Sequence, residues 1–401
     1  MSGPALPAFT WLSPTRVVFG VGALGQLASL VDETAGPGAR VFLVTGRKSL
    51  EARGIRPRVV EAIGPRRVSL FDQVPPFPSP DVVGRALAAC RDARAAIVVA
   101  IGGGSVMDVA KSVAILMTHE GTAREFATTP SAAGARAAVT SRAADAGDRR
   151  PKSFERPGLP VVAVPTTSGS SSEVTPFAAL WDFPAKRSMH LAGPFLFPRV
   201  ALVDPELAMS MDRELAAATG MDALTSAFES YWSLEAEPVS DALNLEVIRL
   251  LGENLERSCA GGDLPARSAC ALAATLAGIA YSNSRPNVCH AVSSPLTLFW
   301  GVAHGRAVGI TLPAFLRWNA PAIAPKLPAL WRALGVESLD DAIRRIARLM
   351  ERCGLEARLR DLGVGAGDVE TLVEHMRWDR VTVLPRPLGR ADARAIFQEL
   401  L

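Results

Sequence analysis

Two histidines and one aspartate in the second half of the sequence could together bind a divalent metal ion. His290 stands in the segment CHAVSSPL and His304 in GVAHG, while Asp222 stands in GMDAL. Two imidazole nitrogens and a carboxylate oxygen are a common ligand set for iron(II) or zinc. The residue types therefore predict a metal site at these three positions. The alternative is that both histidines are ordinary core side chains with satisfied hydrogen bonds.

A glycine-rich segment in the first half could bind the phosphates of a nucleotide. The run IGGGSVMDVAK follows the apolar stretch AAIVVAI and opens a helical pattern. Gly102, Gly103 and Gly104 have no Cβ atom, so the backbone can approach a pyrophosphate, and a helix N-terminus offers free N–H groups. We predict a phosphate site here, because the alternative, a tight turn, needs one glycine rather than three.

A literal Gly-x-Gly-x-x-Gly at Gly20, Gly22 and Gly25 is interpreted as a structural turn instead. It follows only the short run VVF. No clear acidic residue closes a dinucleotide-binding unit about 20 residues further on.

Hydroxyl side chains gather after another apolar run. The segment PTTSGSSSEVT includes Thr166, Thr167 and Ser170. Such hydroxyls can bond to phosphate, ribose or a nicotinamide amide. A serine nucleophile is disfavoured, because the chain has no Gly-x-Ser-x-Gly segment and few histidines nearby.

The elements that must position these residues change in character along the chain. Short β-branched runs predict buried parallel strands at 16–19, 39–45, 67–71, 95–101 and 160–164. Later patterns predict helices at 214–232, 239–257, 264–282, 339–353 and 391–401. We therefore expect an α/β domain over residues 1–203, with an exposed, mobile insertion near 119–158, and an all-α domain over residues 204–401. Cofactor and substrate would meet between them.

The composition excludes several classes of protein. Of 401 residues, 49% are hydrophobic and 21% are charged, which excludes a mainly disordered chain. The net charge of +3 gives no global field that would attract nucleic acid or anionic lipid. Five scattered cysteines predict reduced core thiols. Without an evident signal segment or a run of about 18 apolar residues, we expect a soluble cytoplasmic protein with no nucleic-acid or membrane partner.

The order of the motifs resembles the iron-containing, or group III, alcohol dehydrogenase family over nearly the whole chain. The matching segments are TRVVFGVGALGQL, GGGSVMDVAKSVA, PTTSGSSSEVT, VDPELA, GMDALTSAFESYWS and HAVSSPL with GVAHG. The resemblance implies a Rossmann-like parallel-sheet domain and a helical domain, an architecture shared with dehydroquinate synthase. It also implies hydride transfer between NADPH or NADH and an alcohol or aldehyde at Fe²⁺ or Zn²⁺, in a homodimer or larger assembly.

The same resemblance implies roles for single residues. Those implied to bind the cofactor are Gly102, Gly103, Gly104, Ser105, Asp108, Thr166, Thr167, Ser170 and Lys186. The glycines and the serine after them would hold the pyrophosphate. The other hydroxyls would contact the nicotinamide side, with the aspartate and the lysine nearby.

The end of the second predicted strand bears on the choice of nucleotide. Where NAD-specific members often have an aspartate after Val-Thr, this chain has Gly46, Arg47 and Lys48. The lost carboxylate and the two gained cations favour a ribose 2′-phosphate. We therefore predict that NADPH is accepted and is the candidate preferred nucleotide.

The chain departs from the family at the metal site. The family has a histidine four residues after the aspartate, on the same helix face, but Ser226 stands there. Asp222, His290 and His304 could still bind the ion, with Ser226 or water completing the shell. Ser294 replaces another histidine of many relatives, so we expect a proton route through water or a ribose hydroxyl.

Within the family, ESYWSLEAEPVSDALNLEVIRLL and NSRPNVCHAVSSPLTLFWGVAHGRAVGITLP look most like the phosphonoacetaldehyde reductase branch, which makes 2-hydroxyethylphosphonate. Branch members have a lysine where this chain has Arg285, and a guanidinium there could hold a phosphonate with two parallel hydrogen bonds. The alternative role for Arg285 is a surface or interdomain salt bridge.

Other functions remain open from the sequence. A different alcohol or aldehyde could be the substrate. Without a metal, Ser226, Lys186 or Arg285 would stabilise the developing oxyanion. A lyase similar to dehydroquinate synthase would share the architecture, but the hydroxyl and histidine motifs fit the dehydrogenases better. A nucleotide-binding non-enzyme would have lost its chemistry together with the missing histidine.

Overall fold

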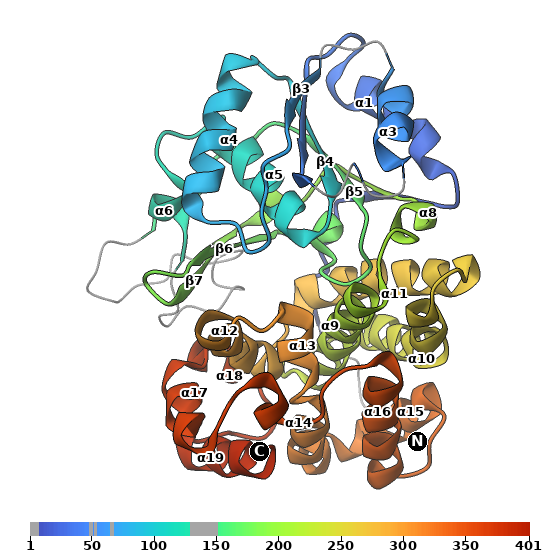
Figure 1. Cartoon of the computed structure of the whole chain (residues 1–401), viewed down its shortest axis with the longest axis vertical. Coiled ribbons are helices and arrows are strands. Elements are labelled where there is room, and N and C mark those ends of the chain that lie inside the picture. The colour runs from blue at the N-terminus through green and yellow to red at the C-terminus, as the bar shows by residue number, and fades with distance from the viewer. Residues whose placement is uncertain (1–7, 48–50, 52–53, 65–67, 129–150) are drawn as a thin grey trace.

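A sheet domain and a helical domain lie one above the other along the long axis of the molecule (Figure 1). The computed structural model describes residues 8–47, 51, 54–64, 68–128 and 151–401. The N-terminal half forms the sheet domain, and the C-terminal half supplies the helices below it.

The sheet domain is built on a six-stranded parallel sheet. From one edge to the other, its strands are β3 (Val68–Phe71), β2 (Val41–Thr45), β4 (Ile97–Gly102), β5 (Val161–Pro165), β8 (Val200–Val203) and β1 (Arg16–Phe19). The central strands β4 and β5 are buried at every position. Continuous apolar runs are required in a parallel sheet that is covered on both faces. The predicted parallel-sheet fold is confirmed.

Helices cover both faces of this sheet. On one face lie α1 (Leu27–Ala35) and α3 (Ile55–Ile63), and on the other lie α4 (Pro80–Asp92) and α5 (Gly104–Leu116). The side chains of β4 alternate between the layers. Val98 packs with α4 and α5, whereas its neighbours pack with α1 and α3, as the two-residue period of a strand requires.

A two-stranded antiparallel sheet follows the hydroxyl-rich segment and was not expected from the sequence. In it β6 (Phe177–Asp182) pairs with β7 (Arg187–Ala192). Ala178 and Leu191, a directly paired couple, face the apolar core that includes α5. The residues next to Ala178 on β6 and next to Leu191 on β7 therefore face away from this core.

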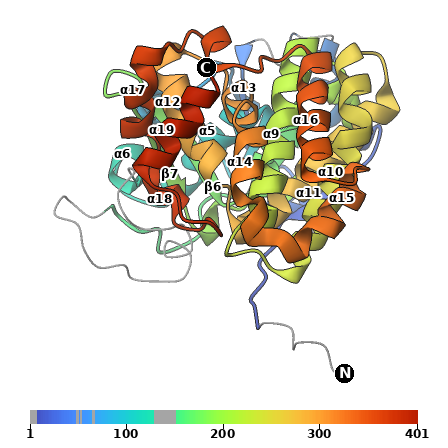
Figure 2. The same cartoon turned by 90° about the horizontal axis from the view of Figure 1, so that it is seen from below.

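After β8 the chain is helical. The longest helices are α9 (Arg213–Trp232), α10 (Pro238–Ala260), α11 (Leu264–Ser284) and α16 (Leu339–Cys353), all predicted from the sequence. Shorter ones are α8 (Pro205–Ala208), α12 (Val288–Trp300), α13 (His304–Gly309), α14 (Leu312–Asn319), α15 (Leu327–Leu334), α17 (Val369–His375), α18 (Trp378–Val381) and α19 (Arg390–Glu399). The view from below shows α9 inside this domain, in contact with α10 and α16 (Figure 2).

One helix, α11, is long and apolar enough to cross a membrane by length and composition alone. However, 61% of its most apolar 18-residue window is buried inside the protein. Its residues Cys270, Ala273 and Ala277 belong to the core that it shares with α9 and α10. This burial is that of a core helix.

The two ends of the predicted insertion near 119–158 are packed against the sheet domain. Thr128, which follows α6 (Ala123–Phe126), forms an isolated bridge with β7. Phe154 stacks on Phe126 with ring centroids 4.8 Å apart. The remaining part, residues 129–150, lies outside the described residues.

The Gly-x-Gly-x-x-Gly segment forms a turn whose donors are already used. The N–H of Gly22 donates to Asp204 Oδ1 at 3.2 Å, and the N–H of Leu24 donates to Asp204 Oδ2 at 3.1 Å. Because this carboxylate takes both donors, they are not available to a phosphate.

All five cysteines are buried and free. Their predicted place in the core is confirmed.

Candidate active site

A cavity of about 1070 Å³ opens where the sheet domain meets the helical domain. Its lining comes from the carboxyl ends of sheet strands, from one face of the β6–β7 hairpin, and from α9, α12, α13 and α18. The carboxyl edge of a doubly wound sheet is where such folds bind ligands.

The glycine-rich segment lines this cavity at the start of α5. Gly103, Gly104 and Ser105 all contribute to the lining. A Cβ on Gly104 would lie 2.7 Å from the Ser170 side chain, and a Cβ on Gly103 would lie 3.2 Å from Thr167 Oγ1. The hydroxyl segment thus packs directly on the glycines. The first N–H groups of a helix have no partner within the helix, so this start of α5 can receive a phosphate.

Asp108 also lines the cavity, but its carboxylate is held by the protein. It accepts hydrogen bonds from Ser172 Oγ at 2.6 Å and from the N–H of Ala179 at 3.0 Å. Lys111 Nζ lies 3.6 Å from Asp108 Oδ1 and donates to the carbonyl of Ser172 at 3.0 Å. Burial raises the pKa of Asp108 and lowers that of Lys111, and their mutual attraction opposes both shifts. Together they fasten the hydroxyl segment to α5.

The structure separates the predicted hydroxyl ligands. Thr167 and Ser170 line the cavity. Thr166 is buried, and its N–H donates to the carbonyl of Gly102 at 3.0 Å. Neither Thr166 nor Gly102 is among the residues that line the cavity. Both pack behind the residues that do.

The predicted nucleotide-selecting segment reaches the cavity in part. Gly46 and Arg47 line it at the end of β2, and Arg85 of α4 lines it as well. Lys48 lies outside the described residues. Arg85 was not predicted, because a single arginine on a helix far along the chain from Gly46 gives no local signal.

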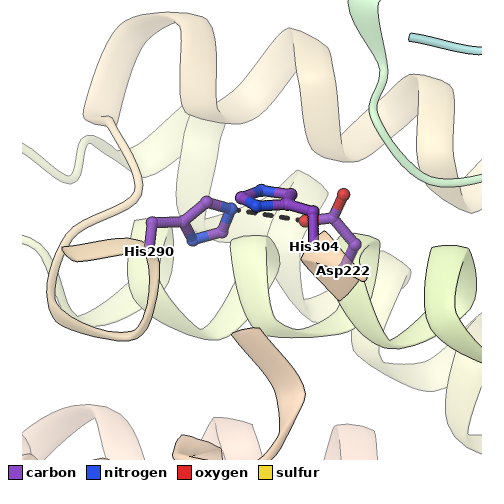
Figure 3. Close-up of side chains that lie close together, drawn as sticks. All are labelled: Asp222, His290 and His304. Atoms are coloured by element: carbon purple, nitrogen blue, oxygen red, sulfur yellow. Dashed lines mark ion pairs between the residues drawn. The ribbon is translucent and has the colours of Figure 1, made fainter. Parts of the chain in front are cut away.

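Asp222, His290 and His304 lie close together (Figure 3). Their ligand atoms are all within 4.8 Å of one another, and His290 Nε2 is 3.3 Å from Asp222 Oδ1. The aspartate comes from α9, and the histidines come from the starts of α12 and α13. All three line the cavity. Two imidazoles and a carboxylate at this spacing fit a divalent ion and leave a coordination position for another ligand.

A buried glutamate that sequence analysis missed holds one of these histidines. Glu229 is fully buried, and its Oε2 is hydrogen-bonded to His290 Nδ1. Asp222, Ser226 and Glu229 lie four and three residues apart on α9 and so share one face. That spacing is the feature of the sequence from which Glu229 could have been identified. A carboxylate on the second ring nitrogen orients a metal-binding histidine.

The surrounding charges shift the two histidines in opposite directions. Burial lowers the pKa of His290, but the Glu229 and Asp222 carboxylates outweigh it and raise the pKa to about 9. Burial, together with the charge of His290, lowers the pKa of His304 to about 4. The two rings lie with their centroids 5.5 Å apart.

The two serines that replace family histidines both face the cavity. Ser226 Oγ lies 3.5 Å from His290 Nε2. Ser294 lines the cavity one turn beyond His290 on α12. Both positions are therefore close to the cluster, but neither offers an imidazole.

Two predicted catalytic residues are engaged elsewhere. Lys186, in the turn between β6 and β7, donates to the carbonyl of Leu298 at 2.6 Å and lies over the Phe299 ring. It is not among the described residues that line the cavity. Arg285 does line the cavity, but its Nε and Nη2 both donate to Glu235, the former at 2.7 Å. The salt bridge, which was the alternative role for Arg285, thus occupies two of its guanidinium nitrogens.

Family models match both halves of the chain. The model described as iron-containing alcohol dehydrogenase matches residues 14–205, and the model for the C-terminal part of the Fe-containing alcohol dehydrogenase family matches residues 216–401.

Individual proteins are similar over almost the full length. Long-chain-alcohol dehydrogenase 1 of Geobacillus thermodenitrificans is 30% identical, covering 96% of this chain and 97% of the relative. A solved 1,3-propanediol oxidoreductase has a TM-score of 0.87 at 31% identity, covering 98% of this chain and 100% of that chain. Sulfoacetaldehyde reductase of Bifidobacterium kashiwanohense, solved in complex with NAD⁺, has a TM-score of 0.84 at 27% identity, covering 98% and 99%.

Proposed function

The chain belongs to the iron-containing alcohol dehydrogenase family, and we propose that it reduces a small aldehyde to its alcohol with NADPH or NADH in the cavity between its two domains. It is an oxidoreductase that acts on the CH–OH group or on the corresponding aldehyde. The proposed physiological direction is reduction.

One observation carries this proposal. A single cavity is lined both by the start of α5, at Gly103, Gly104 and Ser105, and by the cluster of Asp222, His290 and His304. A nucleotide whose pyrophosphate lies on the first group can extend its nicotinamide toward the second. Hydride transfer needs that juxtaposition of cofactor and carbonyl.

The proposed cofactor contacts follow from the lining. Ser105 and the N–H groups beside it would hold the pyrophosphate, and Thr167 and Ser170 would bond toward the nicotinamide side. Arg47 would bind a ribose 2′-phosphate, which supports the use of NADPH. The complex of the sulfoacetaldehyde reductase with NAD⁺ supports a nicotinamide nucleotide in this fold.

Asp222, His290 and His304 would hold a divalent ion, Fe²⁺ or Zn²⁺. When bound, such an ion supplies a Lewis acid for the carbonyl oxygen. Glu229 keeps the His290 ring oriented through its Nδ1. Ser226 and Ser294 offer hydroxyls on the cavity wall, from which water can be held to return a proton to the alkoxide.

We propose a phosphonate-bearing aldehyde as substrate, with phosphonoacetaldehyde reduced to 2-hydroxyethylphosphonate. Support comes from the resemblance of the segments around Glu235 and Arg285 to that branch. The similarity to a sulfoacetaldehyde reductase also supports a small aldehyde with a strongly acidic group. The second candidate is the same reduction of an uncharged aldehyde.

A metal-independent reaction is the alternative mechanism, and Ser226 is the observation that favours it. Where the family has a fourth ligand, this chain offers only a hydroxyl 3.5 Å from His290. In that case Ser226 would donate to the developing oxyanion.

Several coarser expectations belong to this proposal. The functional division at residues 203 and 204 is supported by the two family matches. A homodimer in the cytoplasm is proposed from the resemblance, and the exposed Val17, Phe19 and Val21 at the edge strand β1 support a self-association surface. The proposed partners are small molecules, without nucleic acid or membrane.

The test is steady-state oxidation of NADPH and of NADH by the purified chain with phosphonoacetaldehyde, sulfoacetaldehyde and propanal. We expect turnover with at least one aldehyde, and a lower KM for NADPH than for NADH. Arg47→Gln should raise the KM for NADPH about tenfold, because one charge-assisted bond to phosphate is lost. Absence of turnover with all three aldehydes, in protein shown to bind NADPH, would refute the proposal.

A further inference from the structure

Three residues that line the cavity each carry a buried polar atom with no hydrogen-bond partner among the described residues. These atoms are Ser188 Oγ, His190 Nε2 and Arg377 Nη1. An unpaired buried polar atom costs about 1–3 kcal/mol, so native proteins seldom retain one without a reason. Three such atoms at one cavity indicate a polar ligand that supplies their missing hydrogen-bond partners.

Two of these atoms come from one face of the β6–β7 hairpin. Ser188 and His190 are two residues apart on β7 and therefore point the same way. Trp181, paired with Ser188 in the register, lies beside His304 with ring centroids 6.3 Å apart. This hairpin face is thus next to the histidine cluster.

Arg377, directly before α18, supplies the third atom. It is 8% exposed, and its Nε and Nη2 donate to Asp379 at 2.9 and 2.7 Å. The carboxylate fixes the plane of the guanidinium and leaves Nη1 unused. Such a group is preorganised to donate to an anion.

Arg380, on α18, adds a second cation to the lining of the cavity. It lines the cavity, and it makes no ion pair or side-chain hydrogen bond with the part of the chain that the structure describes. Burial and the neighbouring Arg377 lower its pKa to about 10, so it remains cationic at neutral pH. Its charge also lowers the pKa of both His190 and His304, which places it within electrostatic range of them.

The balance of charge favours an anion at this place. Asp379 makes its ion pair with Arg377, whereas Arg380 feels the Asp379 and Glu229 carboxylates only through longer-range attraction and makes no ion pair with them among the described residues. Arg285, the residue singled out from the sequence, is neutralised by Glu235. The arginine without an ion-pair partner among the described residues therefore lies on α18, at the cavity wall.

We propose that Arg377, Arg380, Ser188 and His190 form a subsite for the anionic group of the substrate, a phosphonate or sulfonate one or two carbons from the carbonyl. This inference rests on the proposed reduction of an acidic aldehyde and names the residues that would bind its acidic group. A tetrahedral oxyanion has enough acceptor lone pairs for several donors at once. Uncharged His190 donates from Nε2, and Arg285 is left as a structural ion pair.

The test compares kcat and KM for phosphonoacetaldehyde, sulfoacetaldehyde and propanal in the wild-type chain and in Arg380→Gln. We expect the wild type to prefer an anionic aldehyde. In the variant, the KM for that aldehyde should rise about tenfold or more, and the ratio of kcat/KM for it over propanal should fall by a similar factor. Ser188→Ala, a small change that preserves packing, should move the same ratio in the same direction.

Arg348→Gln is the matched control, because Arg348 is exposed on α16 and does not line the cavity. It should leave the ratio unchanged. An equal ratio in wild type, Arg380→Gln and Ser188→Ala would overturn the inference, and so would a wild type that prefers propanal. Either result would leave the aldehyde reductase assignment intact.

A binding measurement separates the two proposals if no aldehyde is turned over. Calorimetric titration of the NADPH-loaded wild type with ethylphosphonate should show binding that Arg380→Gln weakens about tenfold. Equal binding by both chains, or none by either, would overturn the subsite independently of activity.

Discussion

At the scale of single residues, Ser226 is the position where this chain differs most consequentially from its family. Its Oγ lies 3.5 Å from His290 Nε2, on the same face of α9 as Asp222. A serine hydroxyl is a far weaker ligand than an imidazole for iron(II) or zinc. The predicted site therefore has three strong protein ligands rather than four.

We predict that Ser226→His raises the affinity for Zn²⁺ at least about tenfold, because a fourth strong ligand is added one helical turn from Asp222. The measurement is competition with a chromophoric chelator. Ser226→Ala is the control and should not tighten binding. Equal affinity in the wild type and Ser226→His would show that position 226 does not face the ion.

The sequence was sufficient to select the three residues that cluster in the structure, but not the residues that support them. Asp222, His290 and His304 were chosen by residue type and resemblance, and the structure brings them within 4.8 Å. Glu229 escaped notice because a glutamate on a long helix is usually solvated. Lys186 was assigned by resemblance alone, and its ammonium is instead bonded to a backbone carbonyl. Such pairings depend on tertiary packing, which one sequence does not specify.

At the scale of elements, the contact between α5 and the hydroxyl segment depends on one buried lysine. Lys111 is 1% exposed and donates to the carbonyls of Ser172 and Thr175 at 3.0 and 3.3 Å. It also neutralises Asp108 at 3.6 Å. It thus holds the segment that packs on Gly103 and Gly104, the predicted phosphate site.

We predict that Lys111→Met lowers the free energy of unfolding by about 3–5 kcal/mol, because it leaves a buried carboxylate without its partner. Urea denaturation measures this. Lys152→Met is the matched control: its pair with Glu125 is 3.1 Å long but about half exposed, and it should cost about 1 kcal/mol or less. An equal loss of unfolding free energy in Lys111→Met and Lys152→Met would contradict the structural role given to Lys111.

The elements that were predicted and those that were missed differ in how they are buried. Strands β2, β4 and β5 are apolar runs covered on both faces, which is a strong local signal. The β6–β7 hairpin has one face on the core and one on a polar cavity. Its functional face carries serine and histidine, so its hydrophobic alternation is weak and the hairpin was not predicted.

At the scale of the whole molecule, the edge strand β1 presents an apolar surface. Val17 and Phe19 are 37% and 39% exposed, and Val21 after them is 56% exposed. A solvent-facing parallel edge with such side chains invites pairing with another chain.

We predict that Val17→Lys shifts a homodimer toward monomer, because a charge on this edge opposes association. Light scattering after size-exclusion chromatography measures the mass. Val60→Lys on α3, at a side chain 63% exposed, is the control and should leave the mass unchanged. A dimer that survives Val17→Lys would place the interface elsewhere.

The central claim is that aldehyde reduction depends on a divalent ion at Asp222, His290 and His304, and the most direct measurement is NADPH oxidation on one sample whose metal content is assayed throughout. We predict that chelation removes the ion and the activity together, that Fe²⁺ or Zn²⁺ restores both, and that Asp222→Asn cannot be restored to the wild-type rate. Undiminished turnover in a sample with no detectable metal would contradict this account and identify Ser226 as the donor to the oxyanion.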